Sequence, residues 1–217
     1  MAVETILISE PALIPVWFYS YSAVVYLLSA AIGFLISYFS FRLYRISSVK
    51  FNLILSLAFL ALGFAFTTLT VTSLYTYFYL PYFKTLQNLS SVNNIGFNLY
   101  YLTSLIGYLL ILMMYLPEKI KNKFFILYVP LWYTDFTTFH LVSALFLFYV
   151  VVRNVMNFTK KKNLNSFLVM FAFATMLIFH VLLLQISFTP TLYLLAHSFL
   201  TIGFGALLMM LIRVSRK

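Results

Sequence analysis

The stretch LIPVWFYSYSAVVYLLSAAIGFLISYFSF, residues Leu13–Phe41, contains no Asp, Glu, Lys or Arg and decides the fold class. A helix needs about 20 consecutive apolar residues to cross a hydrocarbon core about 30 Å thick. The run is too long for the apolar core of a signal peptide, and the residues before it include Glu4 and Glu10 but no basic residue. It therefore predicts a helix that stays in the membrane.

Apolar runs of similar length continue along the whole chain. The 217 residues are 64% hydrophobic and only 8% charged, whereas a soluble domain is about 45–50% apolar and about 25% charged. The clear runs are Leu13–Ser40, Phe51–Leu80, Ile95–Leu116, Thr137–Asn157, Ser166–Ile186 and Thr191–Ile212. The sequence therefore predicts one all-α integral membrane domain that covers residues 1–217.

A seventh apolar run, Ile120–Thr134, is shorter than the others. It would reach only about 22 Å as a helix, and Pro130 interrupts it. The basic residues nevertheless favour a seventh span, because seven spans with the N-terminus outside place four basic clusters on the cytoplasmic side and leave only Lys84 outside. These clusters are Arg42/Arg45/Lys50, Lys119/Lys121/Lys123, Arg153/Lys160/Lys161/Lys162 and Arg213/Arg216/Lys217.

We therefore expect a polytopic bundle of seven transmembrane helices in the plasma membrane, with the N-terminus outside, the C-terminus in the cytoplasm and a short fourth helix. The net charge of +10 is spread over short loops on one side, which is typical of a topology signal and argues against a nucleic-acid partner. The lipid bilayer is the expected partner. The absence of cysteine excludes disulfides, thiolate metal sites and cysteine nucleophiles.

Three histidines, His140, His180 and His197, stand inside the apolar runs near the end of the chain. The last two runs are joined by the short segment Ser187–Thr191. His180 and His197 are nearly equidistant from this segment, so in an antiparallel helix pair both rings lie about 10 Å below the outer surface. His140 enters from the same side at a slightly shallower level. The sequence thus predicts a histidine layer in the outer leaflet.

Imidazole is costly in hydrocarbon unless it is paired or ligated, so intramembrane histidines indicate a functional site. Two facing histidines can ligate a haem iron axially, and three can hold a zinc or copper ion. Asp135 and Gln185 lie at the outer rim as candidates to orient a ligand histidine. The plain alternative is that each ring only hydrogen-bonds a neighbouring helix.

The face of the last helix that carries His197 also carries Tyr193 and Thr201, which are further candidates to orient the imidazole. Gly203 and Gly205 follow on this helix. Because they lack side chains, they leave room either for a flat cofactor or for close contact with another helix.

Two functions follow from this pattern. The first is a cofactor-holding membrane subunit for electron transfer, in which His180 and His197 are axial ligands of a b-type haem and His140 is a third ligand or a proton-relay group. Its partners would be a quinone or other membrane subunits. The second is a non-catalytic sensory or scaffold subunit of a membrane complex, whose histidines are merely hydrogen-bonded.

Several membrane classes are not supported by the residues. The layout resembles that of microbial rhodopsins and other seven-helix receptors, but the last helix has no lysine for a retinal Schiff base. Seven-helix zinc hydrolases pair two histidines four residues apart, whereas Thr201 stands four residues after His197. Asp135 is the only Asp, so the two aspartates of an intramembrane aspartyl protease are missing. Transport is not favoured, because we find neither an internal repeat nor a buried acid.

Overall fold

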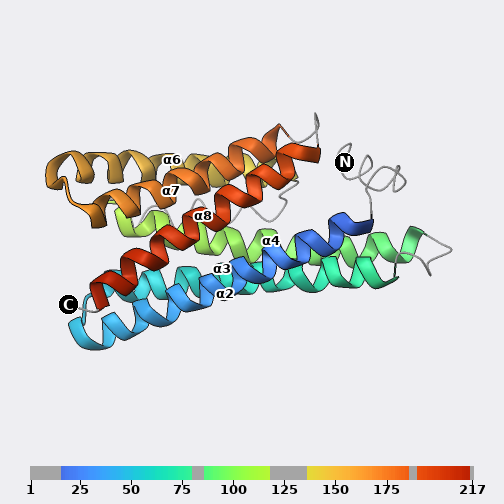
Figure 1. The fold of residues 1–217 in the computed structure, drawn as a ribbon, viewed down its shortest axis with the longest axis horizontal. Helices are drawn as coiled ribbons and strands as arrows, with labels where there is room; N and C mark the ends of the chain where they lie inside the picture. Colours follow the sequence, from blue (N-terminus) through green and yellow to red (C-terminus); the bar gives the residue numbers. More distant parts are fainter. Residues whose placement is uncertain (1–15, 80–85, 118–135, 186–189, 216–217) are drawn as a thin grey trace.

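A computed structural model describes residues 16–79, 86–117, 136–185 and 190–215. These residues form helices and no strand. The helices are α2 (Val16–Ser47), α3 (Lys50–Tyr79), α4 (Leu86–Tyr115), α6 (Phe136–Lys161), α7 (Leu164–Leu184) and α8 (Pro190–Ser215), shown in Figure 1. All six are long and apolar enough to span a membrane. The expected multi-pass helical class is confirmed, while the seventh run, Ile120–Thr134, and Asp135 lie outside the described residues.

Two very short turns join α2 to α3 and α6 to α7. The residue directly after each preceding helix lies in the left-handed region, Ser48 with φ 54° and Lys162 with φ 45°. Their backbone N–H groups donate to the carbonyl oxygens of Tyr44 and Phe158, both at 2.8 Å. This geometry is the αL form of helix C-cap, which satisfies a carbonyl that the helix leaves free. The two turns are therefore built in the same way.

The six helices form a closed ring. Each described helix contacts the next one along the chain, and α8 contacts α2. The two short turns and the last residues of α4 and α8 lie at one end of the bundle, at the left of Figure 1. We call this end the basic end, because it gathers every Lys and Arg among the described residues: Arg42, Arg45, Lys50, Arg153, Lys160, Lys161, Lys162 and Arg213.

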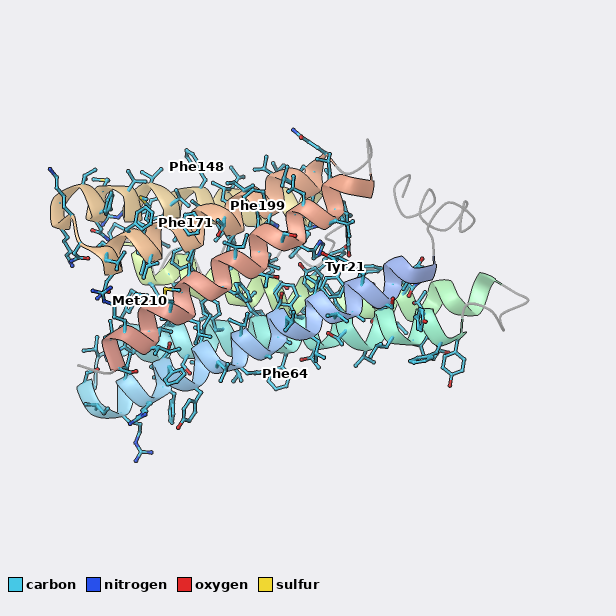
Figure 2. All side chains as sticks on the ribbon, in the orientation of Figure 1. Tyr21, Phe64, Phe148, Phe171, Phe199 and Met210 are labelled. Carbon is cyan, nitrogen blue, oxygen red and sulfur yellow. The ribbon has the colours of Figure 1, made fainter. Side chains whose placement is uncertain are left out.

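The interior of the ring is filled by large aromatic side chains. Phe59, Phe66 and Phe204 are fully buried, and Phe204 forms edge-to-face pairs with the other two, at 5.4 Å between the rings of Phe59 and Phe204 and 5.7 Å between those of Phe66 and Phe204. The outside is apolar as well: Phe64 and Phe148 are more than half exposed and point away from opposite sides of the bundle (Figure 2). A bundle that is apolar on its outer surface suits a lipid environment.

The ring consists of two three-helix units that share one order and one direction. Unit one is α2–α3–α4 and unit two is α6–α7–α8, and the first helix of each unit starts at the end opposite the basic end (Figure 1). Exchanging the two units leaves the set of helix contacts unchanged, because α4 contacts α6 just as α8 contacts α2. The bundle therefore has an approximate twofold axis along its length.

Close helix contacts repeat residue by residue between the units. A Cβ atom placed on Gly107 would lie 3.0 Å from the carbonyl oxygen of Ala58, and one placed on Gly203 would lie 2.9 Å from that of Ala172. In both units the glycine of the third helix thus lets it approach the backbone of the second helix. Ala58 and Ala172 are 114 positions apart in the sequence, while Gly107 and Gly203 are 96 apart.

The same two spacings relate stretches of similar sequence. Residues 106–114 of α4 read IGYLLILMM, and residues 202–210 of α8 read IGFGALLMM. Residues 26–30 of α2 read YLLSA, and residues 140–144 of α6 read HLVSA. The spacing is smaller for the third helices because α3 and α4, with 30 residues each, are longer than α7 and α8, with 21 and 26 residues. The expectation that the chain has no internal repeat was therefore wrong.

Candidate site between the two units

His140 and His180 form a hydrogen-bonded pair across α6 and α7. Their Nδ1 atoms lie 2.9 Å apart, and both side chains are buried. A hydrogen bond between two imidazole nitrogens requires that one nitrogen carries the proton and the other accepts it. The pair therefore satisfies one nitrogen of each ring without any other partner. It matches the alternative in which an intramembrane histidine bonds a neighbouring helix.

His197 lies close to this pair but is held separately. Its Nδ1 is 2.8 Å from the carbonyl oxygen of Tyr193, and since a carbonyl only accepts, the Nδ1 atom donates. The ring of Phe179 packs edge-on against the ring of His197, 5.1 Å away, and also contacts that of His140 at 6.1 Å. The three histidines thus surround one phenylalanine, close together as their positions in the sequence suggest. His197 faces aromatic rings rather than His180.

The expected neighbours of His197 hold it in place from its own helix. Tyr193 stacks against the imidazole with 4.1 Å between the rings. Thr201 donates to the carbonyl oxygen of His197 at 3.0 Å, and its hydroxyl lies 3.4 Å from that of Ser29 on α2. Both therefore fix the backbone and the ring of His197. Gln185 is instead the exposed C-cap of α7.

The two glycines of α8 have different surroundings. Gly203 packs against Ala172 and Thr175 of α7, so it serves close helix contact. A Cβ on Gly205 would meet no atom within 4 Å, and Gly205 borders a groove of about 480 Å³ with Leu208, Met209, Ile212 and Arg213. This groove lies toward the basic end, two helical turns from His197. Neither glycine makes room beside the histidines.

A cavity of about 30 Å³ lies between the two units beside the histidines. It is lined by Tyr26, Leu69, Phe97, Tyr100, Tyr101, Phe136, His140, Phe179, Leu183, Tyr193 and His197. Eight of these residues form four equivalent pairs, which are Tyr26 with His140, Leu69 with Leu183, Phe97 with Tyr193, and Tyr101 with His197. The cavity therefore lies on the approximate twofold axis. It has room for one or two water molecules.

Tyr108 is a member of this site that the sequence analysis missed. Its ring contacts that of His180 edge-on, with 4.9 Å between the centroids. Among the described residues, no hydrogen-bond partner is present for the Tyr108 hydroxyl, for Nε2 of His180 or for the Ser143 hydroxyl, although all three atoms are buried. The similarity of residues 106–114 to residues 202–210 could have singled out Tyr108, because it replaces a phenylalanine of the other copy.

The arrangement does not fit a haem between His180 and His197. Nδ1 of His180 is hydrogen-bonded to His140, and the cavity of about 30 Å³ is at least ten times smaller than the 300–1,000 Å³ of ordinary small-molecule sites. Within the part of the chain that the structure describes, no group of three or more His, Asp or Glu side chains could hold a metal ion. The ligand roles expected for His140, His180 and His197 remain predictions.

No known protein family matches the sequence, and the comparisons with curated proteins and with solved structures found no significant match.

Proposed function

We propose that the chain is a membrane transport protein in which the two three-helix units move relative to each other around the central cavity. The observation that carries this proposal is the position of the cavity on the approximate twofold axis, lined by equivalent residues of both units. Transporters built from parallel repeats hold their substrate between the repeats, and alternating access follows when one repeat rocks against the other. The internal repeat, whose apparent absence argued against transport, thus becomes its main support.

The direction of the helices supports a seventh crossing. Helix α4 ends at the basic end, whereas α6 begins at the opposite end (Figure 1). The chain between Tyr115 and Phe136 has to bridge the length of the bundle, and twenty helical residues span about 30 Å, which is the thickness of the hydrocarbon core. The concentration of Lys and Arg at the basic end supports a cytoplasmic location for this end and an outer N-terminus, and we propose the plasma membrane as the location of the protein.

The lining of the cavity favours a small polar solute. Imidazole and phenol groups offer donors and acceptors inside walls that are otherwise aromatic, as in sites where a few polar groups orient a ligand. At about 30 Å³ the cavity holds only a few atoms. We therefore infer that the described conformation is a closed one, and that a larger opening forms when the units separate at one end.

Three other functions use the same residues. A sensory subunit would bind its ligand in this cavity from outside without letting it pass, and a scaffold subunit would keep the site permanently closed. A b-type haem or metal subunit that exchanges electrons with a quinone or with other membrane subunits would need the His140–His180 pair to open. It has the least support, because the pair is already closed by its own hydrogen bond.

The absence of cysteine makes accessibility mapping a direct test. Single variants Leu69→Cys and Leu183→Cys place a thiol in the cavity, one from each unit. The matched controls Phe59→Cys and Phe173→Cys stand on the same helices in the packed core, outside the cavity lining. The variants are treated with a membrane-impermeant thiol reagent in vesicles of both orientations.

For a transporter we expect both cavity positions to react from either side of the membrane, many-fold faster than the two controls. Reaction from the outer side alone would contradict transport and support a sensory function. Absence of reaction from both sides would leave only a scaffold.

A further inference from the structure

The two units differ in chemistry at one equivalent trio of side chains. In unit one Phe66 contacts Tyr26 at 6.3 Å between rings, and it contacts Phe204 of the other unit at 5.7 Å. The equivalent residues around unit two are His180, His140 and Tyr108, with 5.1 Å between the two histidines and 4.9 Å between His180 and Tyr108. The arrangement of the three rings is thus repeated. The first trio consists of one phenol and two phenyl rings, whereas the second consists of two imidazoles and one phenol.

Packing alone does not require this replacement. The equivalent position in the other copy is filled by Tyr26, Phe66 and Phe204, and of these three side chains only Tyr26 carries a polar atom. In the second copy two buried polar atoms, Nε2 of His180 and the hydroxyl of Tyr108, have no partner among the described residues. Unpaired buried polar groups are costly, and intramembrane ionisable groups mark sites of function. The second copy therefore carries chemistry that the fold does not need.

The hydrogen bond between His140 and His180 determines how many protons the pair can hold. In the neutral pair one ring donates from Nδ1, so its Nε2 has a free lone pair, while the other ring accepts at Nδ1 and keeps its proton on Nε2. One additional proton can bind to the free Nε2 without breaking the bond between the rings. A second proton would place hydrogen on both Nδ1 atoms and force them apart. The pair is thus built to take up a single proton.

The described groups around this pair carry no fixed charge. They are Tyr108, Tyr100 and Tyr101 from α4, His197 and Tyr193 from α8, and Tyr26 from α2. No Asp, Glu, Lys or Arg among the described residues faces it, because the described basic residues gather at the basic end and the four acids lie outside the described ranges. Among the described residues, a proton on the pair would therefore be the main positive charge at this level of the bundle.

We propose that the His140–His180 pair binds one proton taken from water that reaches the cavity, and that this proton couples to the movement of the two units. His140 lines the cavity, so the incoming proton has a route to the pair, and it returns to water when the cavity opens to the other side. The pair belongs to unit two, while Tyr108 belongs to unit one. An imidazolium on His180, whose ring lies 4.9 Å from that of Tyr108, strengthens the contact between the units through cation–π attraction.

This inference rests on the proposed transport function and adds proton coupling to it. The test combines nitrogen-15 NMR of the three histidines, in protein reconstituted into lipid nanodiscs, with the cavity accessibility described above at several pH values. The double variant His140→Tyr/His180→Phe installs the residues of unit one at the equivalent places, so it keeps the packing that the fold already uses. His197→Tyr, which installs the equivalent of Tyr101, identifies the third histidine signal.

For the unaltered protein we expect the His140 and His180 signals to change together on acidification, with uptake of one proton by the pair, and the reaction rate of Leu183→Cys to change over the same pH range. In the double variant we expect the rate to become independent of pH while both sides remain accessible. The variant Tyr108→Leu, which removes the aromatic ring, should weaken the pH effect, whereas Tyr108→Phe, which keeps the ring, should not.

Three results would overturn the inference. These are histidine signals that stay neutral throughout, two histidines that titrate independently, or a pH effect on accessibility that survives in the double variant. Accessibility from both sides without any pH effect would retain transport and reject proton coupling. Absence of reaction at Leu69→Cys and Leu183→Cys in protein that keeps both histidines would reject the transport function itself.

Discussion

His180 occupies in unit two the position that Phe66 occupies in unit one. Each stands on the middle helix of its unit. Among its ring contacts, each touches the equivalent ring of the first helix of its own unit, Tyr26 or His140, and the equivalent ring of the third helix of the other unit, Phe204 or Tyr108. Because the two units are copies within one chain, features that both share at equivalent positions are attributed to packing, and features found in one unit only are not. The aromatic bulk is common to both copies, so it belongs to the fold, whereas the imidazole nitrogens are found in one copy only.

The glycine contacts give a first prediction about stability. Gly107→Ala and Gly203→Ala each place a Cβ at 3.0 Å or less from a backbone carbonyl oxygen of the neighbouring helix, so the helices must move apart. We expect each substitution to lower the free energy of unfolding by about 1–3 kcal/mol. The control Gly205→Ala meets no atom within 4 Å and should be neutral or slightly stabilising. Thermal unfolding in detergent measures all three, and equal effects at Gly205 and Gly203 would contradict the packing.

The two short turns give a second prediction. Ser48 and Lys162 have φ values of 54° and 45°, where glycine has no steric penalty. We expect Ser48→Gly and Lys162→Gly each to raise the free energy of unfolding by up to about 1 kcal/mol. Substitution of either by Val, whose branched side chain tolerates this region poorly, should lower it. Unfolding curves in which glycine and valine have the same effect would show that the turns adopt another conformation.

The seventh crossing is tested by topology mapping. In the cysteine-free chain, Asn122→Cys and Thr134→Cys stand near the two ends of the run Ile120–Thr134. We expect an impermeant thiol reagent to label Asn122→Cys from the cytoplasmic side and Thr134→Cys from outside. Labelling of both positions from one side would contradict the seventh span and, with it, the parallel arrangement of the two units across the membrane.

The cofactor hypothesis has a spectroscopic test. The cavity of about 30 Å³ cannot hold a porphyrin, so we expect the reduced-minus-oxidised absorption spectrum of the purified protein to show no haem α-band. Metal analysis of the same sample should find no stoichiometric zinc or copper. A sharp α-band that disappears in His197→Ala would instead restore the electron-transfer function.

Much of the fold was predictable because the lipid bilayer itself requires an apolar composition and apolar runs of spanning length, whatever the details of side-chain packing. The runs Phe51–Leu80 and Thr137–Asn157 match α3 and α6 closely. The positions of His180 and His197 relative to one turn were enough to bring them near each other. Their partners were not predictable, because a shift of one residue around a helix turns an imidazole from one neighbour to another.

The repeat was missed for a different physical reason. A helix in lipid is constrained mainly to be apolar, so most equivalent positions differ in side chain while keeping the same shape. The contacts that fix the geometry, such as Gly107 on Ala58 and Gly203 on Ala172, are few and lie at two different spacings. Similar sequence at residues 106–114 and 202–210 was visible, but only the structure shows that both stretches make the same contact.

Relative movement of the two units is the central claim, and a distance measured between them tests it most directly. Spin labels on Ile46→Cys, which is 75% exposed at the end of α2, and on Lys161→Cys, at the end of α6, report the separation of the units at the basic end. We expect pulsed dipolar spectroscopy in nanodiscs to find two distances whose populations shift with pH, and the shift to vanish in His140→Tyr/His180→Phe. A single narrow distance that is the same at every pH would show a rigid bundle and contradict transport.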